Sequence, residues 1–337
     1  MTMKKTTCPK VSIACRTFNA SGTIARAIRS VLNQTYENWE LIIADDGSSD
    51  DTVAIIKQFH DERIRLHVNT SNLGPIGNLN KVFSLCSGTY IAVLDGDDFY
   101  RPTKLEKQVN FLETHPDYGA VFSYITCDAK ITSNLINRPF HSREDMIREI
   151  FFYQNFLAFP TEMFRKELLV HFPEPLIATG DCNFHLQTLF KTKIKILEEP
   201  LVVYNTQGDH VSSWINNQVV DTENMLLLKT FTKLTDLELF KSTFRNYYER
   251  YGQIKSTADI PYFIARIAIE TPQRSASGLY LLAELFLDDA YFNHIRQTYQ
   301  VSYGDYINIR KGISQPKPKH KHKIRRFFKK ILIPLKH

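Results

Sequence analysis

The chain has 337 residues, of which 43% are hydrophobic and 23% are charged, a balance that is typical of a globular protein with a sizeable core. Its length fits one large domain with an appendage, or two domains, and its five cysteines are scattered without a C-x-x-C pair, which argues against a zinc site. The net charge of +6 is uneven, because residues 316–337 hold nine of the 42 Lys and Arg and no acidic residue.

The N-terminal ten residues lack the apolar core of a signal peptide, and no uncharged apolar stretch approaches the ~20 residues that span a bilayer. We therefore expect no signal peptide and no membrane-spanning helix. An odd number of scattered cysteines is typical of reduced thiols in a cytoplasmic protein.

The first half of the chain alternates short apolar runs with stretches of helical periodicity. The pattern predicts strands over residues 10–14, 39–44, 64–68 and 90–94, and helices from near 21, over 53–59 and over 78–86. A loop is expected at 15–19. Such β-α alternation predicts an α/β fold with a mostly parallel sheet and right-handed crossovers, and a further strand is expected at 120–126.

Two acidic clusters follow predicted strands. Tyr90–Asp98 reads Y-I-A-V-L-D-G-D-D, and the pair Asp45-Asp46 ends the second predicted strand. Parallel strands bring both clusters to one sheet edge, where open α/β sheets bind ligands. Folding alone gives no reason to gather these charges, whereas Mn2+ or Mg2+ would relieve their repulsion and recruit substrate phosphates. The alternative is an acidic turn that caps the following helix.

A dinucleotide-binding or P-loop protein is disfavoured. The first strand is followed by C-R-T-F-N, which contains no G-x-G-x-x-G, and the chain has no G-x-x-x-x-G-K-[ST]. A nucleotide here must be held by acidic side chains and a metal.

An ordered set of motifs resembles glycosyltransferase family 2, whose members have the GT-A fold. They are V-S-I-x-x-x-T-F-N at 11–19, S-V-L-N-Q-T-Y-x-N-W-E-L-I-I-x-D-D-G-S-x-D at 30–50, N-x-G at 72–74, G-x-Y-I-A-x-L-D-G-D-D at 88–98 and P-x-K-L-x-x-Q at 102–108. The resemblance implies GT-A architecture, inverting sugar transfer from a nucleotide-sugar and a role in building bacterial surface polysaccharides.

The resemblance also implies roles for individual residues. Thr17 and Phe18 would line the base pocket, Asp46 would accept a hydrogen bond from the base (uracil is expected), Asp95 would hold the ribose, and Asp97 would ligate Mn2+ or Mg2+. The full set implied for nucleotide-sugar binding is Arg16, Thr17, Phe18, Asn19, Asp46, Asn78, Lys81, Asp95 and Gly96. For Phe18, simple core packing is the alternative.

The chain departs from the family where many members read A-R-N, since it has Asn78-Leu79-Asn80-Lys81 instead. Arg16 or Lys81 could supply the missing cation. The segment T-G-D-C-N-F at 179–184 resembles the family segment with the catalytic base, which implies that Asp181 accepts the acceptor's proton, although an Asp opening a helix is also a good N-cap. His210 resembles a family His near the metal, with a longer gap than usual.

Residues 221–310 have helical periodicity and no catalytic signal, and could build the acceptor groove or an oligomer contact. Residues 324–335 place apolar side chains on one helical face and Arg or Lys on the other, which predicts binding to an anionic membrane surface, with a disordered basic tail or a nucleic-acid patch as the alternatives. We expect no nucleic-acid partner, because the apolar stripe has no use there.

We expect a GT-A domain over 8–218, a helical appendage over 219–313 and a basic amphipathic tail over 314–337. The predicted function is metal-dependent transfer from a UDP-sugar to a glycan or lipid-linked acceptor, by an enzyme bound peripherally to the inner face of the cell membrane. A sugar nucleotidyltransferase and a non-catalytic nucleotide-sugar-binding subunit are the alternatives. The first is disfavoured because its first loop is usually glycine-rich and basic.

Overall fold

The computed structural model describes residues 8–127, 139–140, 142–153, 156–174, 176–205 and 217–310. These fall into two compact units, which meet in sequence between Leu285 and Phe286. The first unit contains the sheet and most of the helices, and the second contains α11 (Asp289–Tyr299) and α12 (Tyr303–Arg310). The predicted His210 and the predicted membrane-binding segment 324–335 lie outside the described residues.

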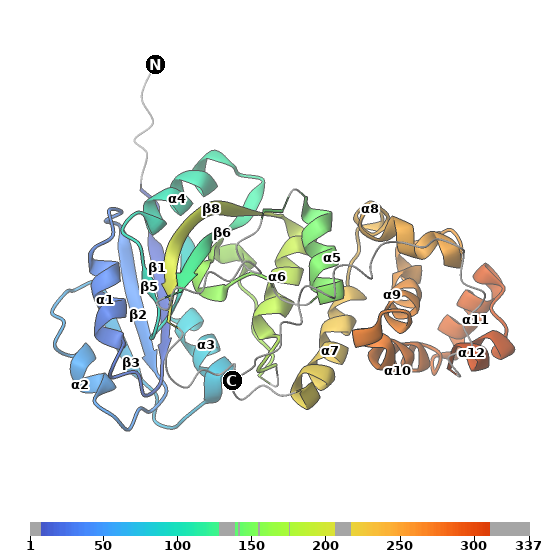
Figure 1. Ribbon diagram of the computed structural model, residues 1–337, viewed down its shortest axis with the longest axis horizontal. Coiled ribbons are helices and arrows are strands. Elements are labelled where there is room, and N and C mark those ends of the chain that lie inside the picture. Colours follow the sequence, from blue (N-terminus) through green and yellow to red (C-terminus); the bar gives the residue numbers. More distant parts are fainter. Residues whose placement is uncertain are drawn as a thin grey trace, which may run out of the picture. The chain divides into compact units, whose positions relative to one another are not determined.

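An eight-stranded mixed sheet forms the centre of the first unit (Figure 1), in the order β3-β2-β1-β4-β7-β6-β8-β5. Its strands are β1 (Val11–Thr17), β2 (Trp39–Asp45), β3 (Ile64–Val68), β4 (Tyr90–Asp95), β5 (Phe99–Tyr100), β6 (Tyr118–Cys127), β7 (Met163–Arg165) and β8 (Lys193–Tyr204). Strands β1 to β4 pair in parallel, as does β6 with β8, whereas β7 runs antiparallel to both β4 and β6. The expected mostly parallel sheet is confirmed.

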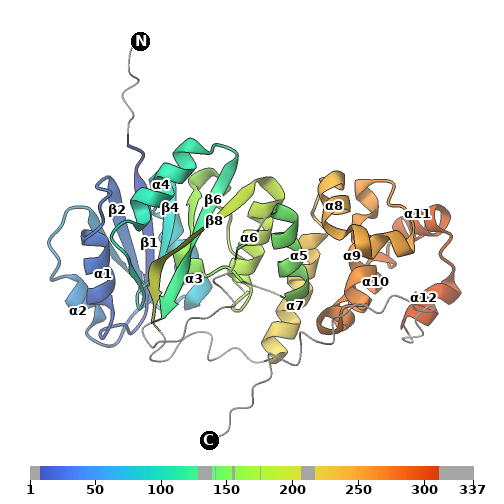
Figure 2. The same ribbon diagram turned by 45° about the horizontal axis from the view of Figure 1, so that its top comes forward.

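The helices between β1 and β6 in the chain alternate with the strands, as the sequence predicts. They are α1 (Ile24–Leu32), α2 (Thr52–Ile56), α3 (Gly74–Ser84) and α4 (Lys104–Thr114). Figures 1 and 2 show α1 and α3 on opposite sides of the strands. Buried apolar side chains of α1 and α4, including Ile28 and Leu105, pack against Ile13, Leu41 and Leu94 of the sheet.

A second, aromatic core lies on the α3 side. Phe83 of α3 contacts Phe164 of β7 and Phe172, with ring centroids 5.9 Å and 5.7 Å apart, and Phe164 contacts Phe184 at 4.9 Å. Phe184 belongs to α6 (Gly180–Lys191). These buried rings fix α6 against the sheet, because aromatic pairs combine large buried area with preferred geometry.

The remaining helices of the first unit are α5 (Arg143–Tyr153), α7 (Asn217–Phe231), α8 (Leu237–Tyr248), α9 (Ile260–Ile269) and α10 (Ser275–Leu285). The predicted helical character of 221–310 is confirmed, with one correction. The helical spacing over 277–292 predicts one continuous helix, but α10 ends at Leu285 and α11 starts at Asp289, because Asp288 caps α11 by accepting hydrogen bonds from the N–H groups of Ala290 and Tyr291.

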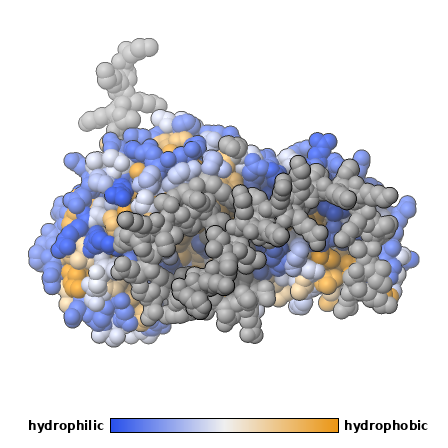
Figure 3. Space-filling model, in the orientation of Figure 1, coloured by the Kyte–Doolittle hydropathy of each residue, from blue (hydrophilic) through white to orange (hydrophobic). Residues whose placement is uncertain are grey.

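The described helices include none with the length and apolar character needed to cross a bilayer. On the face drawn in Figure 3, the described surface is mostly hydrophilic, with apolar residues in small patches. All five cysteines are free, in agreement with their scattered spacing.

Candidate functional site

The carboxyl ends of β1, β2 and β4 meet at one edge of the sheet. Thr17 pairs with Asp45 in the β1–β2 register, and Arg16 pairs with Asp95 in the β1–β4 register. The expected loop at 15–19 is therefore partly wrong, because β1 continues through Thr17. Arg16 and Thr17 consequently sit on a rigid strand.

Backbone hydrogen bonds hold the residues that follow these strands. The Asp46 N–H donates to the Thr17 carbonyl (2.9 Å), and the Gly96 N–H donates to the Arg16 carbonyl (3.1 Å). Gly96 is required by close approach, because a Cβ there would lie 2.7 Å from Thr17 Oγ1. Thr17 Oγ1 is buried, and within the described part of the chain it has no hydrogen-bond partner.

The acid cluster after β4 includes an ion pair with Arg16. Arg16 Nε lies 2.6 Å from Asp95 Oδ1, and its Nη2 lies 3.3 Å from Asp95 Oδ2. Burial alone would lower the pKa of the Arg16 guanidinium, but Asp95, with smaller contributions from Asp181 and Asp97, raises it. The guanidinium is therefore permanently charged among these carboxylates.

Asp98 differs from its neighbours because it is buried. Its Oδ1 accepts a hydrogen bond from the Asn205 N–H (2.9 Å), while its Oδ2 has no partner among the described residues. Burial, together with the charges of Asp95 and Asp97, raises the pKa of Asp98 well above its ordinary value. A cation bound at this cluster would relieve both the repulsion and the unpaired oxygen.

The described residues contain no set of three His, Cys, Asp or Glu side chains arranged to bind a metal. Mg2+ and Mn2+ do not require such a set, since oxygen ligands from one or two carboxylates suffice when substrate phosphates and water complete the shell. The Asp97 carboxylate offers oxygen ligands of the kind that such an ion takes, while both oxygens of Asp95 bond to Arg16.

Three asparagines form hydrogen bonds that hold the loops at this edge of the sheet. Asn69 Nδ2 donates to Asp46 Oδ1 (2.9 Å) and to Asn78 Oδ1 (3.0 Å), and Asn78 Nδ2 donates to the Ala44 carbonyl (2.9 Å). Asn78 is 3% exposed, so its visible role is to fix Asn69 and, through it, Asp46. Asn19 has a positive φ of 48° and accepts a hydrogen bond from the Ser49 N–H (2.9 Å).

Phe18 is 46% exposed, which excludes the alternative that it is a core residue. Lys81 lies half-buried on α3. Of the two cations that could replace the family Arg, Arg16 is the one that interacts electrostatically with Asp95, Asp97 and Asp181.

Asp181 lies in the first turn of α6 and reaches the same cluster. The Cys182 N–H donates to its Oδ1 (2.6 Å). Burial raises the pKa of Asp181, and the negative charge of Asp95 adds to this, whereas His185, the Cys182 N–H and Arg16 oppose it. A carboxylate with a raised pKa is a better proton acceptor, as a general base requires.

Two further buried titratable residues were not predicted from the sequence. His185 Nε2 lies 3.1 Å from Glu162 Oε2, and both side chains are fully buried. Burial raises the pKa of Glu162, and His185 opposes this. The available signal was Glu162 itself, a charged residue inside the apolar run 159–164.

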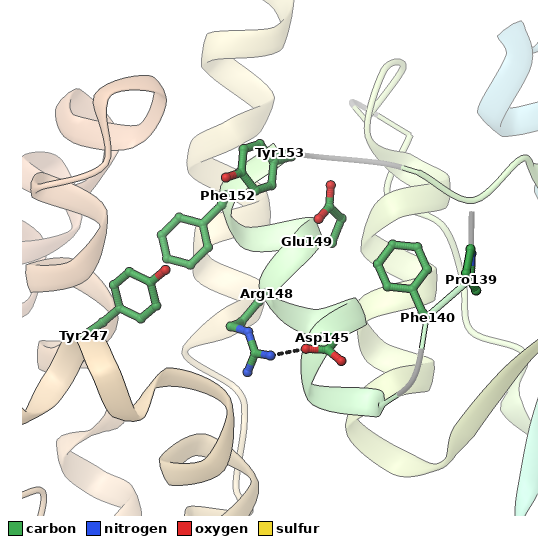
Figure 4. Close-up of a pocket in the computed structure, with 8 residues that line it drawn as sticks. All are labelled: Pro139, Phe140, Asp145, Arg148, Glu149, Phe152, Tyr153 and Tyr247. Carbon is green, nitrogen blue, oxygen red and sulfur yellow. Dashed lines mark hydrogen bonds and ion pairs between the residues drawn. The ribbon is translucent and has the colours of Figure 1, made fainter. Parts of the chain in front are cut away.

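A separate cavity of about 320 Å³ opens beside α5 and α8. Phe152, Tyr153 and Tyr247 line it with the Arg148–Asp145 ion pair (Figure 4). It contains none of the predicted site residues.

Comparison with known proteins supports the same family as the motifs. Residues 12–173 match the family described as "Glycosyl transferase family 2". An uncharacterized glycosyltransferase of Methanocaldococcus jannaschii is 30% identical over 220 residues, covering 62% of this chain and 76% of that protein. The Escherichia coli UDP-Glc:alpha-D-GlcNAc-diphosphoundecaprenol beta-1,3-glucosyltransferase WfgD is 44% identical over 102 residues, 30% of this chain and 40% of its own length. The chain thus spans less than half of WfgD.

Solved structures share the fold. Staphylococcus aureus TarS 1–349, in complex with UDP-GlcNAc, superimposes with a TM-score of 0.60 at 16% identity, covering 90% of this chain and 91% of TarS. The mannosyltransferase PcManGT of Pyrobaculum calidifontis, in complex with GDP-Man and Mn2+, superimposes with a TM-score of 0.53 at 16% identity, covering 90% and 86%. The expected fold class is confirmed.

Proposed function

The chain belongs to glycosyltransferase family 2, and from this premise we propose that it transfers a sugar from a UDP-sugar to a glycan or lipid-linked acceptor, with inversion at the anomeric carbon. The observation that carries the proposal is the Arg16–Asp95 ion pair at the sheet edge, together with the charges of Asp97 and of Asp181 on α6, which help to raise the pKa of Arg16. A charged clamp for a diphosphate and a carboxylate base are the two parts that such a transfer needs.

The donor half would bind the nucleotide. Phe18 offers an exposed ring and Thr17 an unpaired hydroxyl, while Asp46 is held in place by Asn69 and by the Leu73 N–H (2.8 Å). Asp95, oriented by Arg16, would hold the ribose. UDP as the nucleotide is supported by TarS, which binds UDP-GlcNAc, and by WfgD, which is named for UDP-Glc.

Asp97 would hold Mn2+ or Mg2+, which when bound neutralises the diphosphate and makes it a better leaving group. PcManGT, which binds GDP-Man with Mn2+, supports the use of a divalent ion in this fold. Asp181 would accept the proton of the acceptor hydroxyl as that oxygen attacks the anomeric carbon. One carboxylate acting as base with direct attack inverts the configuration.

The acceptor and the location are extensions of the same proposal. WfgD is named for a diphosphoundecaprenol-linked acceptor, which supports a lipid-linked glycan here. The basic, amphipathic sequence at 324–335 supports peripheral binding to an anionic membrane surface. Together these features favour polysaccharide assembly at the inner face of the cell membrane.

The decisive experiment incubates the protein with a panel of UDP-sugars, and GDP-Man, in the presence of Mn2+ and lipid-linked or soluble glycan acceptors. We expect UDP release that depends on both metal and acceptor. Pyrophosphate formation from UTP and a sugar 1-phosphate would instead indicate a nucleotidyltransferase. Tight UDP-sugar binding without turnover of any acceptor would indicate a binding subunit.

A further inference from the structure

Glu223 of α7 binds the segment that leads into the helix carrying Asp181. Its carboxylate accepts hydrogen bonds from the N–H groups of Ile177 (2.8 Å), Ala178 (2.9 Å) and Thr179 (2.7 Å), and from Thr179 Oγ1 (3.0 Å). Glu223 is 3% exposed and Thr179 is 4% exposed. One buried carboxylate therefore fixes three consecutive peptide groups directly before α6.

The other end of this segment is also fixed. Asn80 of α3 donates to the Phe172 carbonyl (2.8 Å) and accepts from the Phe172 N–H (2.9 Å). A Cβ at Gly180 would lie 3.1 Å from Ile76 Cδ1, so the start of α6 packs closely against α3. Phe172 is thus held by α3, and residues 177–179 are held by α7.

Burying a carboxylate is costly, and an apolar side chain would attach α7 to the domain at lower cost. The geometry of Glu223 offers something that apolar packing does not, namely directional bonds that set the path of residues 177–179. Asp181 comes two residues after Thr179. The direction of its carboxylate therefore depends on the backbone path of residues 177–179.

We propose that Glu223 is a positioning residue for Asp181. The inference rests on the proposed function, because it takes Asp181 as the base of the transfer. Glu223 touches neither donor nor acceptor in this scheme; it sets where the base stands relative to the acid cluster on the sheet edge. The helical region thereby contributes to the reaction, although its sequence carries no catalytic signal.

The test compares Glu223→Gln with Asp259→Asn. The glutamine has one acceptor oxygen and turns an NH2 group toward the N–H donors, so the segment should lose its fixed path. Asp259 is a matched control in the same helical region: it is fully buried, and its carboxylate accepts from the Ser256 N–H (2.8 Å), far from Asp181 in sequence.

For Glu223→Gln we expect kcat to fall by about 10- to 100-fold, because a small misplacement of a reacting group has an effect of this size. The KM for the donor and the dissociation constant for UDP should change by less than about twofold, since the donor half is untouched. In an Asp181→Asn background, Glu223→Gln should cause no further loss, as expected when one residue acts through the other. Hydrogen exchange at the amides of 177–179 should become faster.

The outcomes separate this inference from the proposed function. Loss of activity in Asp181→Asn with normal kcat in Glu223→Gln overturns the positioning role and leaves the function intact. An equal fall of kcat in Asp259→Asn also overturns it, since general loosening of the helices would then suffice. Full activity in Asp181→Asn removes the base assignment on which the inference depends.

Discussion

Arg16 and Asp95 form a two-point ion pair between neighbouring strands, with Nε 2.6 Å from Oδ1 and Nη2 3.3 Å from Oδ2. Both side chains are partly exposed, at 24% and 21%, so the pair borders solvent at the sheet edge. The pair turns the Asp95 carboxylate into a fixed acceptor. These placements lead to predictions on the site and the fold, and the sequence of the tail leads to one more.

The first concerns the cation of the donor site. Arg16→Lys should weaken UDP-sugar binding by about tenfold, and Arg16→Ala more, because Lys cannot form the bidentate pair. Lys81→Ala should have a smaller effect, since Arg16 is the cation among the carboxylates. Titration calorimetry with UDP and Mn2+ measures this. Arg29→Ala, which removes an Arg over the Phe59 ring, is the control. Weaker binding in Lys81→Ala than in Arg16→Ala would reverse the assignment.

The second concerns the base. Asp181→Asn should lower kcat by about 10²- to 10⁴-fold, the usual contribution of general base catalysis, and leave UDP affinity nearly unchanged. Steady-state kinetics and nucleotide titration on the same preparation check this. Near-normal turnover would end the assignment.

The same residue sets a pH dependence. Burial raises the pKa of Asp181 above its ordinary 3.8, and a base must be ionised to work. Transfer should therefore fall as pH decreases, with the acid limb of kcat lying above pH 3.8. A profile of kcat from pH 4 to pH 9, with folding followed by circular dichroism, measures the limb. A rate that stays constant down to pH 4 in folded protein would contradict the prediction.

The third concerns the metal. Chelation with EDTA should abolish transfer, and Mn2+ or Mg2+ should restore it. Asp97→Asn should raise the Mn2+ concentration for half-maximal activity by at least about tenfold, because it removes a charged oxygen ligand. Asp51→Asn, at an exposed aspartate beside α2, should match the parent protein. Metal-independent transfer would exclude this role of Asp97.

The fourth concerns stability. Glu40 of β2 is 4% exposed and accepts hydrogen bonds from Lys10 Nζ (2.7 Å) and Ser12 Oγ (2.6 Å), and from Ser87. Burial would raise its pKa, but these hydrogen bonds outweigh burial and lower the pKa to about 2. A pKa below the ordinary 4.5 means that ionised Glu40 stabilises the fold above pH 4.5, and that this contribution is lost as pH falls toward 2.

Glu40→Gln should accordingly lower the free energy of unfolding at pH 7 by about 1–3 kcal/mol, the range for losing hydrogen bonds to a charged group. The difference from the parent protein should shrink as pH falls from 4.5 toward 2. Urea unfolding at several pH values measures it. Glu238→Gln, at a side chain that is 82% exposed, should change little. A pH-independent difference would show that the charge of Glu40 does not matter.

The fifth concerns the tail. Deleting residues 316–337 should abolish sedimentation with anionic liposomes and leave transfer to a soluble acceptor unchanged, because basic residues contribute about 1 kcal/mol each at such a surface. Vesicles of neutral lipid serve as the control. Equal liposome binding before and after the deletion would refute membrane association through this segment.

The sequence predicts β1 to β4 well, because each of these strands can be recognised from its own residues. A strand such as Tyr90–Asp95 is visible as an apolar run that ends in an acid, and parallel pairing then requires that Asp46 and Asp95 lie at the same edge. Strand β7 could not be placed in the same way, since three residues carry little periodicity and its antiparallel pairing with β4 depends on distant contacts.

The hydrogen bonds of Glu223 and His185 could not be predicted from the sequence, because each joins residues that are far apart in the chain. Glu223 reaches Thr179 across 44 residues, and His185 reaches Glu162 across 23. Each looks in the sequence like an ordinary polar residue on a helix. Their roles emerge only when the aromatic core has brought the helices together.

The hydrogen bonds from Glu223 to residues 177–179 affect how chimaeras of this family should be assembled. The family match ends at residue 173, and an exchange point there would join a foreign α6 to the native α3, whereas a second exchange point between α6 and α7 would separate α6 from its own Glu223. An exchange of this part of the chain should therefore move 172–231 as one block, so that residues 177–179 keep their own Glu223, and should retain an Asn at position 80 to bond to the backbone of residue 172.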